Sequence, residues 1–298
     1  SPYTTGYYHI IFVVHGGRSS RHQKAMNSAD ILLNRRTLLI REVRSWSNTL
    51  KIGAAILLVI TIAGILAPLI TSSDPYYQDY GSILLAPSWE HIFGTDHLGR
   101  DIFSRVIHGI RIDLTVAFVI TYVPMIYGVA IGAIAGYYGG WVDSILMRLL
   151  DTAIAFPFLV LIIVIIAILG PGVQNIYIAV CLVAWTMYAR LARAEMLIER
   201  EKDYMLAAKS MGFPVSRIIF RHALPNIMSP VIVFSMADFV LNILLLSGLS
   251  FLGLGIQAPE PEWGAMIAAG RDYIFDSWWI CTIPGLAIVV TGTSLSLI

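Results

Sequence analysis

Charge, cysteine and recognisable catalytic motifs are all scarce in this chain. Only 13% of its 298 residues are charged, whereas soluble domains usually carry about a quarter, so the deficit indicates a protein of the lipid bilayer. The net charge of +1 gives no general attraction to nucleic acid, and we expect no nucleic-acid partner. The two cysteines, Cys181 and Cys281, lie within apolar runs, which argues against a disulfide framework or a thiolate metal site.

Motifs for nucleotide binding and hydrolysis are also missing. The chain has no GxxxxGK followed by Ser or Thr, and no HExxH, GxSxG or CxxC pattern. We therefore predict that it is not an enzyme, has no catalytic residue and binds no cofactor itself. His91, Asp96, His97 and His108 share one loop, but their spacing matches no helical pair of ligands, so we predict no metal site.

What the chain does have is long apolar runs, with 57% hydrophobic residues and a mean hydropathy of +0.74. About 20 apolar residues cross a bilayer as a helix. We predict an all-α, polytopic membrane protein with a basic cytoplasmic segment over 1–50 and a six-span domain over 51–298. The six predicted spans are 52–70, 114–136, 149–169 with a kink at Pro157, 176–192, 227–246 and 278–298. Because the last run reaches the end of the chain, we expect the natural C-terminus to lie beyond it.

The distribution of positive charge orients these spans. With the N-terminus inside, 16 of the 20 Lys and Arg residues face the cytoplasm: eight in 1–51, one at Arg148 and seven from Arg190 to Arg221. This agrees with the excess of positive charge that cytoplasmic loops carry. The other four, Arg100, Arg105, Arg111 and Arg271, would lie outside. We expect the cluster from Arg100 to Arg111 to form an interfacial helix before the second span.

Two features inside the spans suggest roles. Gly128, Gly132 and Gly136 recur every four residues, which leaves one helix face open to close approach by another helix. Asp238 and Asn242 lie one turn apart in the fifth span. An ionisable group at membrane depth is costly unless it is used. The pair therefore lines a polar pathway or forms a hydrogen bond between helices, and the sequence leaves both open.

A polar segment over 201–225 interrupts the apolar runs. Tyr204, Ala207, Ala208 and Met211 follow helical spacing and form one face. Gly212 can end this helix in a left-handed cap, Pro214 can begin a second, and Pro225 is expected to limit the second. A connector lying on lipid favours bulky side chains on its buried face. The small residues here favour docking against another protein.

Four stretches of the chain carry a family resemblance. They are Asp203–Ala208 with Gly212 and Arg221–Asn226, Gly94–Asp101, Ala135–Gly140 with Asp143, Met147 and Arg148, and Ser250–Gly255 with Pro259, Pro261, Trp263 and Gly264. Over about residues 50–298 the chain resembles the transmembrane permease subunit of bacterial ABC importers, in the dipeptide, oligopeptide and nickel branch and on the side of its "C" subunits. The first stretch resembles the cytoplasmic "EAA" loop of these importers. Leu206 stands where that loop has its Glu, and His222 where many relatives have Ile, so contacts of the Glu are not carried over.

The resemblance implies a type I importer fold and a set of partners. The permease would sit in the bacterial cell membrane with a second permease subunit, two ATP-binding cassette ATPase subunits that bind the ATP, and an extracytoplasmic solute-binding protein. The hairpin would be the coupling helix, and its ATPase-contacting residues would be Asp203, Tyr204, Ala207, Ala208, Met211, Gly212, Phe213, Leu224 and Pro225.

The substrate expected from the resemblance is a peptide or a nickel or metal-chelate complex. The segment around Asp238 looks slightly more like nickel or metal-chelate permeases. The competing hypothesis, from another class of protein, is an ion-coupled secondary carrier. It would transport without any ATPase partner.

Overall fold

Helices make up nearly all the regular structure of residues 47–298, the part of the chain that the computed structural model describes. Within that part, the backbone has one isolated β-bridge, Thr95 to Asp101, and no strand. The predicted basic segment 1–50 lies almost wholly outside the described residues. The helices are α2 (Asn48–Ile65), α3 (Ala67–Ile70), α4 (Ile102–Tyr138), α5 (Gly140–Ile154), α6 (Phe158–Leu169), α7 (Val173–Glu199), α8 (Asp203–Ser210), α9 (Val215–Arg217), the π-helix η1 (Ile218–Ala223), α10 (Leu224–Phe251), α11 (Trp263–Gly270), the 3₁₀ helix η2 (Arg271–Tyr273) and α12 (Trp279–Ser296).

Five helical stretches among the described residues are long and apolar enough to cross a membrane: α2, α4, α7, Val215–Phe251 and α12. A sixth is counted if α5 and α6, which meet at a bend of 77°, form one broken span. The predicted all-α, polytopic membrane architecture is confirmed, and the number of spans reaches six only if α5 and α6 are counted as one span.

Several helices extend beyond the predicted spans or end before them. The helix that contains the predicted second span, α4, begins at Ile102, because Asp101 accepts a hydrogen bond from the Ser104 backbone N–H at 2.8 Å and caps α4 there. The cluster from Arg100 to Arg111 therefore lies mostly in the first turns of α4, where Arg105 is buried, rather than in a separate interfacial helix. The first span ends at Ile65, and the short helix α3 with Pro68 follows it.

The third span departs most from the prediction. Its first helix, α5, begins at Gly140, and Ala155 to Pro157 separate it from α6. Proline lacks a backbone N–H and its ring clashes with the preceding turn. At Pro157 this breaks the helix fully instead of kinking it.

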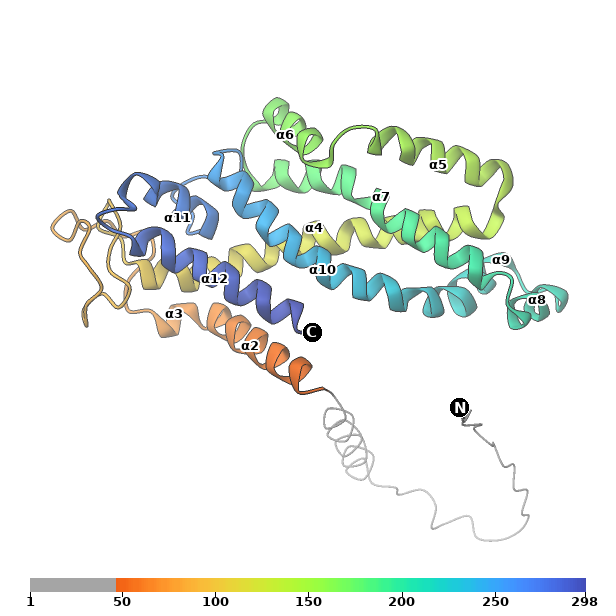
Figure 1. Cartoon of the computed structure of the whole chain (residues 1–298), viewed down its shortest axis with the longest axis horizontal. Helices are drawn as coiled ribbons and strands as arrows, with labels where there is room; N and C mark the ends of the chain where they lie inside the picture. Colours follow the sequence, from red (N-terminus) through yellow and green to blue (C-terminus); the bar gives the residue numbers. More distant parts are fainter. Residues whose placement is uncertain (1–46) are drawn as a thin grey trace, which may run out of the picture. The chain divides into compact units, whose positions relative to one another are not determined.

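The long helices α4, α7 and α10 run beside one another (Figure 1). The closest pair is α4 and α7. A Cβ atom added to Gly128 would lie 2.6 Å from the Trp185 carbonyl oxygen, and one added to Gly136 would lie 2.8 Å from that of Arg193. At Gly132 the Ala189 backbone is closer still. These three glycines therefore allow the backbones of α4 and α7 to touch.

Candidate functional site

A cavity of about 650 Å³ lies between α6, α7 and α10. Its walls are mostly apolar, and the exposed side chains of Leu241, Leu244 and Leu252 form part of them. The two polar side chains that line it are Asp238 and Asn242. A cavity of this size suits a small molecule that is largely apolar and has a few polar groups.

Asp238 and Asn242 also join three helices. The Tyr188 hydroxyl of α7 donates to Oδ2 of Asp238 at 2.7 Å, and Nδ2 of Asn242 donates to the same oxygen at 3.1 Å. Nδ2 of Asn242 also donates to Oγ1 of Thr121 in α4, at 2.9 Å. In the described part of the chain no cation pairs with Asp238. The interhelix hydrogen bonds are thus present, and the same two residues lie at the cavity wall, whereas their role in a transport pathway stays a prediction.

The hairpin of residues 203–217 comprises α8, a turn and α9. Gly212 has a φ of +74°, which a side chain would strain and glycine adopts freely. Met205 and Ala208 form the buried face of α8, whereas Leu206, Ala207 and Met211 are exposed. Ala208 therefore does not belong to the outward face on which the sequence had placed it. The hydrophobic spacing alone could not tell which small residues turn inward.

The other predicted hairpin residues have different positions. Asp203 is exposed in the first turn of α8, and Phe213 is half-buried with its ring stacked on His222 at 6.0 Å between centroids. Tyr204 is only partly exposed, and its hydroxyl donates to Glu199 rather than pointing outward. Burial and this hydrogen bond raise the pKa of Tyr204.

Leu224 and Pro225 lie where the second helix was expected to end, and that expectation was wrong. The helix continues from Val215 to Phe251 as one stretch. Because Pro225 cannot donate a backbone hydrogen bond to the preceding turn, the chain widens into the π-helix Ile218–Ala223 instead of stopping. The hairpin is thereby joined without a break to α10, which lines the cavity.

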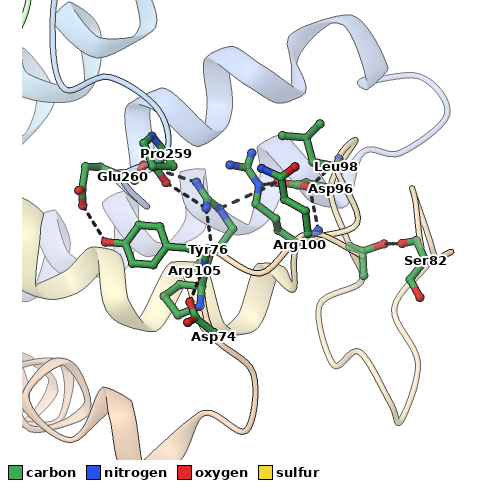
Figure 2. A network of polar contacts seen from close by, with 12 residues as sticks. Asp74, Tyr76, Ser82, Asp96, Leu98, Arg100, Arg105, Pro259 and Glu260 are labelled. Carbon is green, nitrogen blue, oxygen red and sulfur yellow. Dashed lines mark hydrogen bonds and ion pairs between the residues drawn. The ribbon is translucent and has the colours of Figure 1, made fainter. Parts of the chain in front are cut away.

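At the opposite end of the long helices, Arg105 ties two loops together. Its Nη1 donates to the carbonyl oxygens of Pro75 at 2.8 Å and Pro259 at 3.3 Å, and Nη2 donates to that of Glu260 at 3.4 Å. Tyr76 adds a bond from its hydroxyl to Oε2 of Glu260 at 2.9 Å. Figure 2 shows Arg105 beside Tyr76 on one side and Pro259 and Glu260 on the other, which come from loops far apart in sequence. We call this group the arginine clamp.

Asp96 forms several hydrogen bonds within the loop that precedes α4 and Arg105. Its Oδ1 accepts from the backbone N–H groups of Leu98 at 2.8 Å and Arg100 at 3.0 Å, and its Oδ2 accepts from Nε of Arg100 at 2.7 Å. The histidines of this loop do not gather around it: His91 contacts Asp101 instead. Among residues 47–298 no three His, Cys, Asp or Glu side chains are placed to hold a metal ion.

The short helix α11 was not predicted from the sequence, although Trp263 and Gly264 belong to the stretches that carry the family resemblance. Glu262 caps it by accepting from the N–H groups of Gly264 at 2.8 Å and Ala265 at 2.7 Å. Its first residue, Trp263, is fully buried, and the indole N–H donates to the Val106 carbonyl oxygen of α4 at 3.1 Å. Glu is not among the residue types preferred at helix N-caps, so local sequence rules did not indicate this helix.

Comparison with known proteins decides the family. Residues 128–298 match the family described as the binding-protein-dependent transport system inner membrane component. The chain belongs to this family of ABC importer permeases. As the family description implies, it is a multi-pass membrane protein of a transport system rather than a member of an enzyme family, and it works with ATPase and substrate-binding components.

The permease has relatives of similar length. It is 41% identical over 247 residues to the dipeptide transport system permease protein DppC of Alkalihalophilus pseudofirmus, covering 83% of this chain and 81% of the relative. It is 39% identical to the di/tripeptide permease DppC of Pseudomonas aeruginosa, covering 82% of this chain and 83% of that one. The glutathione permease GsiD of Pectobacterium atrosepticum is also 39% identical, with 83% and 82% covered.

A solved structure shares the fold. The inward-facing MetNI methionine ABC transporter aligns with a TM-score of 0.53 at 15% identity, covering 64% of this permease and 91% of that chain. At this identity the likeness shows the fold alone. The predicted type I importer permease fold is confirmed.

Proposed function

We propose that this permease forms part of the membrane pathway of an ATP-driven importer for small peptides. The observation that carries the proposal is the continuous helix Val215–Phe251, which joins the hairpin to the wall of the cavity. A force applied to the hairpin would therefore reach the cavity. The relatives named as dipeptide and di/tripeptide permeases support peptides as the substrate class.

The outward face of the hairpin is the proposed docking surface for an ATPase subunit. Leu206, Ala207 and Met211 are exposed there, and Met211 is 65% exposed. A small residue such as Ala207 lets a partner backbone approach closely. The hairpin lies in the cytoplasm under the orientation that the Lys and Arg residues favour. In this proposal the ATP is bound by the partner, and two ATPases serve two permease subunits.

A second permease subunit would complete the pathway. Leu241 is 62% exposed and Leu252 is 61% exposed on the cavity side of α10. In this proposal the second subunit packs against these two leucines at the open side of the cavity. Asp238 and Asn242 would provide the polar groups of that passage, and the solute-binding protein would deliver substrate at the end where the arginine clamp lies. Transport of nickel or metal chelates stays a prediction from the segment around Asp238.

The experiment that tests docking is the substitution Ala207→Arg. A long charged side chain on the docking surface should abolish co-purification of the ATPase subunits while the permease still inserts into the membrane. Ala207→Ser is the matched control, because it keeps a small residue and should retain the ATPases. ATPases that co-purify equally with Ala207→Arg would contradict the proposal. Uptake of dialanine by liposomes that hold the permease without ATPases would instead favour the ion-coupled carrier.

A further inference from the structure

Glu199, the last residue of α7, is a buried carboxylate where three segments meet. It is only 5% exposed. Its Oε1 accepts hydrogen bonds from the Tyr204 hydroxyl of α8 and from Nδ2 of Asn226 in α10, the latter at 3.0 Å. Its Oε2 pairs with Nζ of Lys202 at 2.6 Å. One side chain thus bonds to the connection before the hairpin, to the hairpin helix and to α10.

The partners of Glu199 also bond to one another. Nδ2 of Asn226 donates to the Tyr204 hydroxyl oxygen at 2.7 Å and to the His222 carbonyl oxygen at 3.0 Å. The Tyr204 hydroxyl also lies 3.4 Å from the same carbonyl oxygen. We call Glu199, Tyr204 and Asn226 the junction. Hydrogen bonds to an ionised carboxylate are about twice as strong as neutral ones and are directional, so the junction fixes one arrangement of the segments it joins.

The junction spans the π-helical turn in the connection between hairpin and cavity. The π-helix Ile218–Ala223 lies between α9 and α10, and π-helical turns within α-helices often occur at functional sites. Around this turn the apolar contacts of Met205 and Ala208 with Ile218 and Ile219 hold α8 in place. Apolar contacts have no direction. The hydrogen bonds of the junction are directional. They join Tyr204, which precedes the π-helix in the chain, to Asn226, which follows it, and so fix the orientation of α8 relative to α10.

We propose that Glu199 is a positioning residue that makes the hairpin, the end of α7 and the start of α10 move as one body. Without it, displacement of the hairpin would be absorbed at the π-helix before it reached Asp238. The inference rests on the proposed docking of an ATPase to the hairpin. It adds a residue that lies outside the docking surface, touches neither ATP nor substrate, and sets how much transport each ATP drives.

The test uses the whole importer complex in liposomes, with ATP hydrolysis and uptake of radiolabelled dialanine measured together. Glu199→Ala should keep ATPase co-purification and ATP hydrolysis, whereas dialanine taken up per ATP should fall about tenfold, the size of a typical coupling between sites. Glu199→Gln should retain most of the ratio, because its amide oxygen still accepts from Tyr204 and Asn226. The matched control is Glu195→Ala, which removes a carboxyl group one turn earlier in α7 and should leave the ratio unchanged.

Two results would overturn the inference. One is an unchanged uptake per ATP in Glu199→Ala, and the other is loss of the ATPases from that variant, which would make Glu199 part of docking. If Glu199→Ala does not fold, Tyr204→Phe decides, since it removes one hydroxyl and should lower the same ratio. Failure of the docking proposal is distinguishable, because it appears as ATPases that stay bound to Ala207→Arg.

Discussion

The Tyr188 hydroxyl on α7 donates a 2.7 Å hydrogen bond to Oδ2 of Asp238 on α10. The bond joins two helices at the wall of the cavity, and Asn242 extends it to Thr121 of α4. Asp238 therefore has an architectural role that is visible in the structure. Its role in the proposed pathway is separate, because it depends on the charge of the carboxylate rather than on its ability to accept a hydrogen bond.

Substitution of Asp238 should separate these two roles. Asp238→Leu leaves the Tyr188 hydroxyl without its acceptor, which should cost about 1–3 kcal/mol of stability. Asp238→Asn keeps an acceptor oxygen and should leave the thermal unfolding midpoint of the detergent-solubilised permease nearly unchanged. We expect Asp238→Asn to lower dialanine uptake nevertheless. Full uptake by Asp238→Asn would mean that the residue is architectural only.

The contact between α4 and α7 should depend on Gly132. Gly132→Leu forces a side chain against the Ala189 backbone, and such overpacking should cost about 1–3 kcal/mol. The thermal unfolding midpoint should fall accordingly. The control is Gly285→Ala in α12, where an added Cβ would meet no atom of another described segment within 4 Å. That change should stabilise slightly, because alanine has the higher helix propensity. Equal midpoints for the two variants would contradict the prediction.

Gly212 should tolerate asparagine but not valine. At a φ of +74° a β-branched residue is strained by about 1–2 kcal/mol, whereas asparagine adopts this conformation more readily. Gly212→Val should distort the turn after α8 and reduce ATPase co-purification, and Gly212→Asn should largely preserve it. In the described part of the chain, no atom beyond the two adjacent residues lies within 4 Å of a Cβ at this position, so crowding would not explain a difference between the variants. Identical ATPase recovery would show that the turn conformation does not matter for docking.

Removing the arginine clamp should loosen the loops that it joins. Arg105→Met keeps the aliphatic length but removes three hydrogen bonds to carbonyl groups, and we expect a loss of about 3 kcal/mol. Limited proteolysis should then cleave the loop around Pro259 faster. Arg271→Met is the control, since among residues 47–298 Arg271 forms an ion pair with its exposed neighbour Asp272 alone, and exposed ion pairs contribute little. Equal cleavage rates in the two variants would argue against a clamp.

Features that depend on residues close together in the chain could be predicted from the sequence. Apolar runs long enough to cross a bilayer placed the spans, and the recurrence of Gly128, Gly132 and Gly136 marked the face that meets α7. The predicted start of an apolar run differs from the observed start of the helix where polar residues are buried by neighbouring segments. Arg105 and Asp113 lie inside α4 and are buried. Because hydropathy counts them as polar, the predicted apolar run begins only at 114.

Proline was the other source of error. Pro157 breaks the third span, whereas Pro225 is absorbed by a wider helical turn. Proline therefore ends one helix and is tolerated within another. The difference depends on whether nearby groups can form hydrogen bonds with the backbone carbonyl that lacks its N–H partner. Local propensity does not contain that information.

By itself, the sequence determined that this is an all-helical membrane protein with a polar hairpin, and its motifs indicated the permease family. Only the tertiary structure decided that Ala208 turns inward, that Tyr204 bonds to Glu199 instead of facing outward, and that Asp238 both lines a cavity and joins α7 to α10. The reason is physical. Hydropathy and helical spacing act over neighbouring residues, whereas these side chains are directed by partners 5 to 50 positions away in the chain.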